Sequence, residues 1–550
     1  MSIVCRSNVY RSVKPLLSAS YPVSYGSMLG KQSSQSGLYS ADSVYLEHVG
    51  RDSFYASLAT LSEKTFPDEQ FAELFRDKGR PSVPPSQLCV ALLLQAHDVV
   101  SDEEAINRTA YDLRWKVALR LNLDEKLCAK STLQRFRAQL VLHKKFEEIL
   151  ERSVGECRRA GLLSGDELEV AVDTTPILGR GAVKDTYNLL ADQIQRVVKA
   201  TVKLKSWNLD EVIETQRLTR YFGTSFKGEA ELDWDAPEQK RALLEDLLAD
   251  GRRALSLARE ALRGFGAGSV RARRLREASA LLSELLLQDI DEDPDDGDGP
   301  KIRQGTARDR VVSTTDPEMR HGRKSSSKTF KGYKASVAAD TGHGVILSTD
   351  VLPGNAHDSE GAAELLSRAS EYAGRAIDRG LGDTSYGSAP VRKKLSAVVE
   401  EVVAKVPPAS HRKGRFSVDD FRISDGLDEA VCPAGKKAAR RSNASADGEP
   451  AVKFTFSQTD CQACPLRESC TSAKARQVTV SQVTRQNQAL RQQQRTKEFK
   501  AKYRRRVVVE RKIGRLVQLG IRQARFFGRL KTKFQVAFAA TVANLKLATG

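Results

Sequence analysis

Three carboxylates in this chain of 550 residues have the types and positions that phosphodiester chemistry needs. Asp173 ends the alternating segment Leu168–Asp173, which predicts a β-strand. Asp383 ends a later predicted strand, and Glu510 lies on a predicted helix. A few carboxylates hold hard cations such as Mg²⁺, and two such ions about 3.5–4 Å apart activate an attacking hydroxyl and stabilise the leaving oxygen. The three acids are therefore candidate metal ligands.

Glu510 is preceded by two residues that share its helix face. Tyr503, Arg506 and Glu510 are spaced i, i+3 and i+7 within a helix predicted over residues 486–520. An acid in a core-facing stripe is unexpected unless a metal or another cation receives it. The arginine could grip a phosphate with two hydrogen bonds, and the tyrosine could stack on a base. Ordinary packing of an amphipathic helix is the alternative.

Positive charge is concentrated at the C-terminal end. The formal net charge is +18 at pH 7 and the sequence pI is about 9.5. Residues 471–550 hold 20 Lys and Arg against two acids, whereas residues 1–470 hold 68 of each sign. This local excess predicts a polyanion as partner, most simply double-stranded DNA. The basic residues expected to contact DNA phosphates, besides Tyr503 and Arg506, are Arg504, Arg505, Arg511, Lys512, Lys324 and Lys334.

Composition excludes several other classes of protein. A hydrophobic share of 40% with 29% charged residues is typical of globular domains. No apolar run is long enough to span a bilayer, and eight cysteines are too few for a disulfide scaffold. We therefore expect a cytoplasmic protein, associated with the nucleoid if its partner is DNA.

Four of the cysteines fall close together. Cys432, Cys461, Cys464 and Cys470 have the spacing Cys-x28-Cys-x2-Cys-x5-Cys, in which one pair has zinc-ligand spacing. A structural Zn²⁺ site is one interpretation. Reduced buried thiols, or a cluster or redox role, are the others.

The elements that must position these residues alternate along the chain. A strand, a hairpin, a helix, a strand, a helix and a strand, followed by a final helix, is the order of a ribonuclease-H-like α/β core. The predicted divisions are a disordered tail (1–42), an all-α N-terminal DNA-binding domain (43–157), the first part of the core (158–187), a helical insertion ending in an acidic linker (188–308), the second part of the core (309–409), a cysteine-containing insertion (410–480) and basic C-terminal helices (481–550).

Several segments together resemble the DDE-type transposases of bacterial insertion sequences, in the branch with a Tyr-Arg-Glu signature. The segments that carry this resemblance are 75–83, Ala171-Val-Asp-Thr-Thr, 316–324, Phe330-Lys-Gly-Tyr-Lys, Gly354-Asn-Ala-His-Asp, Gly382-Asp-Thr-Ser-Tyr and Tyr503-x2-Arg-x3-Glu. The resemblance implies that Asp173, Asp383 and Glu510 hold two Mg²⁺ ions, for which Mn²⁺ can substitute. It also implies cleavage at the terminal inverted repeats of an element, joining to target DNA, and a homo-oligomer assembled on DNA.

Two departures and two alternatives accompany the resemblance. The family signature often continues with a lysine seven residues past the glutamate, where this sequence has Val517. The segment around Asp383 also differs from the Asp-Lys-Gly-Tyr of some branches. A ribonuclease-H-like nuclease without strand transfer is the enzymatic alternative. A domesticated, non-catalytic DNA-binding protein is the other.

Overall fold

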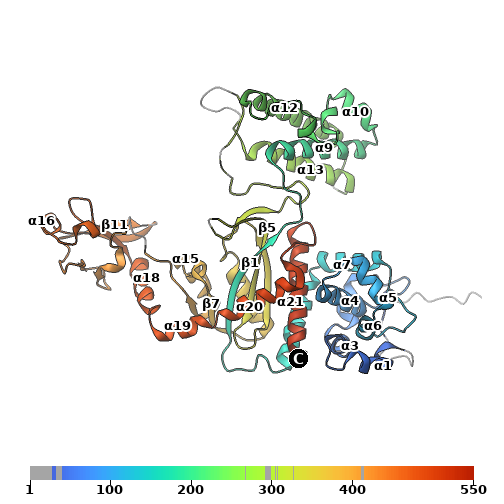
Figure 1. Ribbon diagram of the computed structural model, residues 1–550, viewed down its shortest axis with the longest axis horizontal. Coiled ribbons are helices and arrows are strands. Elements are labelled where there is room, and N and C mark those ends of the chain that lie inside the picture. The colour runs from blue at the N-terminus through green and yellow to red at the C-terminus, as the bar shows by residue number, and fades with distance from the viewer. Residues whose placement is uncertain are drawn as a thin grey trace, which may run out of the picture.

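A computed structural model gives the arrangement of most of the chain (Figure 1). It describes residues 28–32, 40–266, 268–291, 299–303, 305, 307–325, 327–409, 414–446 and 448–550. Most of the predicted tail, and residues 292–298 of the predicted acidic linker, lie outside the described residues.

A mixed six-stranded sheet lies at the centre (Figure 1). Its strands are β1 (Glu169–Leu178), β4 (Arg320–Arg323), β5 (Thr329–Asp340), β6 (Ile346–Pro353), β7 (Ile377–Gly382) and β8 (Val399–Ala404). The order is β4-β5-β1-β7-β8, and β6 also pairs with β5. β1, β7 and β8 run parallel, whereas β5 is antiparallel to β1, β4 and β6. α14 (Ala362–Ala373) and α15 (Ala389–Leu395) connect the later strands.

The strand register explains why two acids distant in sequence become neighbours. β1 pairs in parallel with β7 up to Ala171 and Leu381, and Asp173 and Asp383 each follow two residues later. Residues at matching positions beyond parallel partners lie at the same edge of a sheet. The prediction that β1 ends at Asp173 is wrong, because its pairing with β5 continues to Leu178.

Helices form the N-terminal region, on the right in Figure 1. They are α1 (Ala41–Val44), α2 (Leu46–Val49), α3 (Phe54–Thr65), α4 (Pro85–Asp98), α5 (Asp102–Tyr111), α6 (Leu113–Leu119), α7 (Lys130–Leu142) and α8 (Lys145–Arg159). Apolar side chains at helical spacing close one core, which includes Leu133, Phe136 and Leu140 of α7. That core continues into the sheet and the C-terminal helices, so the N-terminal helices pack on the rest of the protein.

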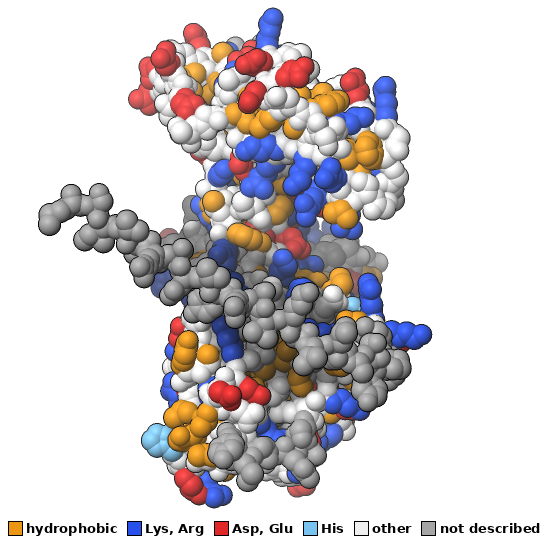
Figure 2. Space-filling view, turned by 90° about the vertical axis from the view of Figure 1, so that its right-hand side faces the viewer, with side chains coloured by type: hydrophobic (Ala, Val, Ile, Leu, Met, Phe, Trp, Pro, Cys, Tyr) orange, Lys and Arg blue, Asp and Glu red, His pale blue; other side chains and the backbone are white. Residues whose placement is uncertain are grey.

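A second group of helices is inserted between β1 and β4, at the top of Figure 1. Its helices are α9 (Thr186–Lys205), α10 (Leu209–Thr215), α11 (Phe226–Glu229), α12 (Pro237–Ala261) and α13 (Val270–Gln288). They bury a core of their own, separate from that of the sheet. Figure 2 shows acidic side chains gathered at the far end of this block and Lys and Arg side chains on the side toward the rest of the protein.

The C-terminal region differs from its prediction. One helix over residues 486–520 is wrong, since the chain forms α18 (Gln482–Gln493), α19 (Lys497–Arg504) and α20 (Val507–Leu516). The Thr496 hydroxyl accepts a hydrogen bond from the Phe499 amide and starts α19 as a new helix. A π-helical turn follows α20, with Gly520 at φ +86°. The predicted helix 531–547 is confirmed as α21 (Arg529–Thr549). No helix in the described ranges has the length and apolarity that a membrane crossing requires.

A small β module occupies the far left of Figure 1. It comprises β9 (Arg422–Ile423), β10 (Ala430–Val431), β11 (Arg440–Ala446), β12 (Glu449–Thr455), α16 (Gln458–Gln462), α17 (Arg467–Cys470) and β13 (Gln477–Ser481). The strands β11, β12 and β13 form one antiparallel sheet, and β9 pairs with β10. We call residues 414–481 the cysteine module; it stands between β8 and the helices that carry Glu510.

Candidate active site

All three predicted acids line one cavity of about 510 Å³. Asp173 comes from β1, Asp383 directly follows β7, and Glu510 comes from α20. α20 packs against β1 and β5, and this contact brings the third acid to the sheet. The structure thus brings together three carboxylates from distant parts of the sequence.

Backbone amides orient the two aspartates. The Thr174 amide donates to Asp173 Oδ1 at 2.7 Å, and the Ser385 amide donates to Asp383 Oδ1 at 2.8 Å. Each carboxylate therefore has one oxygen held by the backbone, and the other oxygen of Asp173 accepts a hydrogen bond from Arg506.

Arg506 lies between Asp173 and Glu510. Its Nη1 is 3.1 Å from Asp173 Oδ2, and its Nη2 is 2.5 Å from Glu510 Oε1. Its guanidinium also lies over the ring of Tyr503, 5.6 Å from the centroid. The signature residues therefore act together, because one arginine holds two carboxylates in place.

The carboxylates repel one another at this site. Burial raises the pKa of Asp173, and the charges of Asp383 and Glu510 raise it further, whereas the Thr174 amide and Arg506 lower it. Clustered anions of this kind gain stability from a cation. The set of carboxylate oxygens suits a hard ion such as Mg²⁺.

The three candidate metal ligands, Asp173, Asp383 and Glu510, do not surround a single point. Within the described residues, no three His, Cys, Asp or Glu side chains already surround one metal position. Arg506 provides the positive charge between Asp173 and Glu510. The chemistry of the donors therefore fits a divalent ion.

Sequence reasoning missed a second layer of polar residues around the cavity. The Thr174 hydroxyl donates to Asp358 Oδ1 at 2.8 Å, and Lys334 Nζ is also 2.8 Å from that oxygen. Asp358 closes the segment Gly354-Asn-Ala-His-Asp, so its presence in a family-like motif was the available signal. Lys334, predicted to contact DNA, is buried and also donates to the Ala356 carbonyl. It therefore supports the loop that carries Asp358.

Of the other predicted DNA-binding residues, one lines the cavity and the rest lie outside it. Lys324 lines the cavity. Arg504 and Arg511 are exposed, and Arg505 pairs with Glu169 at 2.9 Å. Lys512 lies against Gly344, in the turn between β5 and β6, and is not among the residues that line the cavity.

Val517, where the family pattern often has lysine, contributes an apolar wall to the cavity. Arg522 also lines it and lies just beyond the π-helical turn. Its Nη1 donates to the Pro176 carbonyl at 2.7 Å and to the Thr175 hydroxyl at 3.2 Å. A cation of this chain therefore borders the site near the position of the missing lysine. The sequence pattern gave no signal for it.

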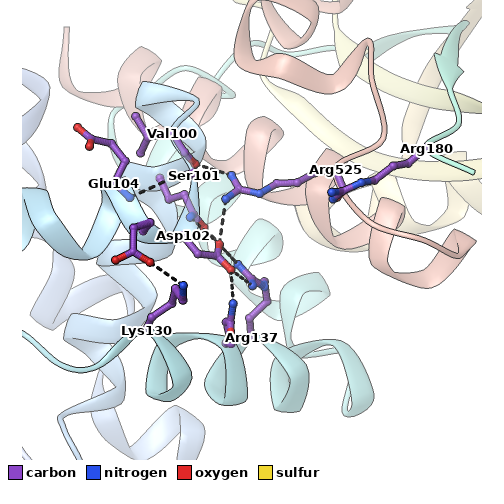
Figure 3. Close-up of polar contacts among 11 residues, drawn as sticks. Val100, Ser101, Asp102, Glu104, Lys130, Arg137, Arg180 and Arg525 are labelled. Carbon is purple, nitrogen blue, oxygen red and sulfur yellow. Dashed lines mark hydrogen bonds and ion pairs between the residues drawn. The ribbon is translucent and has the colours of Figure 1, made fainter.

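A second cavity, of about 750 Å³, lies between the N-terminal helices and the C-terminal segment that follows α20. At its wall, Asp102 of α5 accepts two hydrogen bonds from Arg137 of α7, at 2.8 and 2.6 Å (Figure 3). It also accepts one from Arg525 at 2.9 Å. Arg137, which lies in the region predicted to bind DNA (residues 43–157), therefore makes an internal contact. The Asp102 carboxylate therefore links the N-terminal helices to Arg525, in the segment that follows α20.

Asp102→Asn is expected to weaken this link between the N-terminal helices and the C-terminal segment. Burial opposes ionisation of Asp102, but hydrogen bonds from Arg137, Gln134 and Gln95 outweigh it and hold its pKa well below the usual range. Asparagine keeps one acceptor oxygen but loses the negative charge that pairs with two arginines, at a cost of about 3 kcal/mol. Hydrogen exchange of the α7 amides measures this as a lower free energy of local opening.

The control and the pH dependence make this prediction specific. Glu103→Gln removes an adjacent but exposed pair with Lys130 and should leave the free energy of local opening nearly unchanged. Because the folded pKa of Asp102 is lowered, its contribution is complete above about pH 4 and is lost as pH falls further. Equal opening free energies for Asp102→Asn and Glu103→Gln at neutral pH would contradict the assignment.

The four cysteines predicted as zinc ligands line a third cavity, inside the cysteine module. It is separate from the carboxylate cavity, and the two share no lining residue among those described.

Comparison with protein families gives two matches. Residues 43–139 match a transposase domain (DUF772), and residues 431–548 match a transposase DDE domain. The second match begins in the cysteine module and includes Glu510, whereas Asp173 and Asp383 lie between the two matched segments. Neither the curated proteins nor the solved structures gave a match.

Proposed function

Because this chain is a DDE transposase of the insertion-sequence type, we propose that it binds the terminal inverted repeats of its element, cleaves DNA strands there and joins the freed 3′ ends to target DNA. One observation carries the proposal: Asp173, Asp383 and Glu510 line a single cavity bordered by Lys324 and Arg522. Carboxylates for metal ions and cations for phosphates are the two components that phosphoryl transfer requires.

The strand order supports a ribonuclease-H-like core. The sheet contains the path β6-β5-β1-β7-β8, with β5 antiparallel to its neighbours. Along the chain, β1, the β5–β6 hairpin, α14, β7, α15 and β8 follow one another in the order expected from the sequence. The first and second acids then stand on adjacent parallel strands, and the third arrives on a helix that packs across the sheet. This arrangement favours a rigid platform for the site.

Each residue of the cavity has a role in the proposed reaction. Two Mg²⁺ ions, when bound, activate the attacking water or 3′-hydroxyl and stabilise the leaving oxygen. Asp173, Asp383 and Glu510 would hold them. Arg506 keeps Asp173 and Glu510 in position and is placed to meet the scissile phosphate. Asp358, which accepts a hydrogen bond from Thr174, holds the part of β1 that presents Asp173.

DNA is the substrate that this family implies, and several surfaces are suited to it. Lys324 and the exposed basic side chains of residues 481–550, such as Arg504 and Arg511, would contact phosphates without reading sequence. The N-terminal helices would supply the recognition of the element ends. We further propose that the protein acts in the cytoplasm on nucleoid DNA, as a homo-oligomer that brings two ends together.

A strand-transfer assay tests the proposal. The purified protein is incubated with Mg²⁺, a labelled duplex that carries the inverted repeat flanking its gene, and a supercoiled target plasmid. Labelled ends covalently joined to the plasmid are the expected product. Cleaved ends without joined product would indicate a nuclease. No cleavage, with binding intact, would indicate a domesticated DNA-binding protein.

A further inference from the structure

Four cysteines converge in the cysteine module although they come from separate elements. Cys432 directly follows β10, Cys461 lies in α16, Cys464 follows that helix, and Cys470 ends α17. All four line one cavity of about 30 Å³, together with apolar side chains that include Phe416 and Phe456. None of them forms a disulfide. The volume exceeds that of one water-sized probe, so a single ion has room.

Backbone amides donate hydrogen bonds to two of the four sulfurs. The Lys436 amide donates to Cys432 Sγ at 3.4 Å, and the Arg476 amide donates to Cys461 Sγ at 3.5 Å. The first bond depends on a tight turn over Cys432-Pro-Ala-Gly-Lys, in which Gly435 adopts φ +79°. Hydrogen bonds from amides to sulfur stabilise the thiolate form over the neutral thiol.

The charges around the cavity favour a metal bound by thiolates. Four thiolates that line one small cavity repel one another, so they could not coexist there without a cation. A divalent cation removes that repulsion. The resulting tetrathiolate carries two negative charges, and Arg467 and Arg476 are in place to balance them.

The cysteine module is also small enough to need a cross-link, such as a bound metal, for its stability. It has about 70 residues, a size at which a single core rarely suffices without a metal or disulfides. Its buried apolar core is small: Phe421, Ile423, Leu427, Ala430, Val452, Phe454, Phe456, Val478 and Val480. Three of the four cysteines, Cys432, Cys461 and Cys470, pack against this core. A cross-link at the cavity would join β10, α16 and α17 to one another.

We propose that Cys432, Cys461, Cys464 and Cys470 bind one structural Zn²⁺ ion. The sulfurs line the cavity without surrounding one point, and no closed metal-ligand set occurs among the described residues. Binding therefore requires the four half-buried side chains to turn inward. It displaces up to four thiol protons to solvent, with no change in oxidation state. The site holds the module together at a distance from the carboxylate cavity, so its role is folding.

Metal analysis of the full chain, purified in reducing buffer after growth with zinc, tests the proposal without DNA. About one zinc ion per chain is expected in the wild type and in Cys128→Ser, which changes a half-buried thiol of the N-terminal region. Cys464→Ser should lose most of the zinc. Cys464→His should retain it, since histidine is also a zinc ligand, and this variant covers the case in which the serine variant fails to fold.

Replacement by Co²⁺ gives a second readout. The wild type should show the visible absorption of tetrahedral Co²⁺ bound by thiolates, and Cys464→His should show a shifted spectrum. A wild-type chain that contains no zinc, with four thiols that react freely with a thiol reagent, would overturn the proposal. Iron with acid-labile sulfide would overturn it in favour of a cluster. Neither outcome depends on whether the protein cleaves DNA.

Discussion

Asp173→Asn is expected to slow strand cleavage at an element end by at least about a thousandfold, equivalent to ~4 kcal/mol of transition-state stabilisation. The substitution keeps the size of the side chain and the hydrogen bond from the Thr174 amide. It removes the charge that would hold a metal ion and that pairs with Arg506. DNA affinity should stay the same or rise slightly, because one negative charge leaves a surface that receives phosphates. Single-turnover cleavage and a binding titration measure the two effects separately.

Asp124→Asn is the matched control for this variant. Asp124 is exposed in the N-terminal helical region and lies outside the carboxylate cavity. It should cleave at the wild-type rate. Cleavage by Asp173→Asn within tenfold of the wild type would remove Asp173 from the proposed metal ligands.

Arg506→Lys has the second-largest expected effect. Arginine reaches Asp173 with one nitrogen and Glu510 with the other, and the compact ammonium of lysine cannot bridge both. Losing one of these two charged hydrogen bonds should lower cleavage by about 10- to 100-fold. The charge is conserved, so non-specific DNA binding should change little.

Arg511→Lys provides the comparison on the same helix. Arg511 is exposed on α20, next to Glu510, and does not line the cavity. A lysine there preserves a point charge that can still meet a phosphate, so cleavage should be unaffected. If both variants lose activity equally, the effect of Arg506→Lys reflects general charge geometry on α20 and not the bridge between two acids.

The sequence singled out three acids that line one cavity in the folded chain, but it was less accurate about the elements around them. Alternation of apolar residues marked the strands that carry Asp173 and precede Asp383, and helical spacing tied Tyr503 and Arg506 to Glu510. These local patterns survive folding because each acid sits at a fixed register position. Asp358 was missed as a site residue because it lies in a loop, where no periodicity indicates which side chains turn inward.

The C-terminal helices were predicted less accurately. Strong helix formers run almost unbroken from residue 486 to residue 519, so propensity alone predicted one helix. The Thr496 cap marks the break between α18 and α19, and the π-helical turn after α20 places Gly520 beside Val99 of the N-terminal region. Lys512 was placed in the DNA surface because it is a basic residue next to the Tyr-Arg-Glu signature. In the folded chain its side chain lies beside Gly344 instead.

The central claim is that Asp173 binds the metal ion that supports cleavage, and a metal-dependence switch tests it most directly. Asp173→Cys replaces an oxygen ligand by sulfur, which Mn²⁺ accepts more readily than Mg²⁺. Cleavage of the element end is measured in each metal, relative to the wild type in the same metal. We expect almost no activity in Mg²⁺ and at least about tenfold recovery in Mn²⁺. The same relative activity in both metals would contradict a direct bond between Asp173 and the catalytic metal.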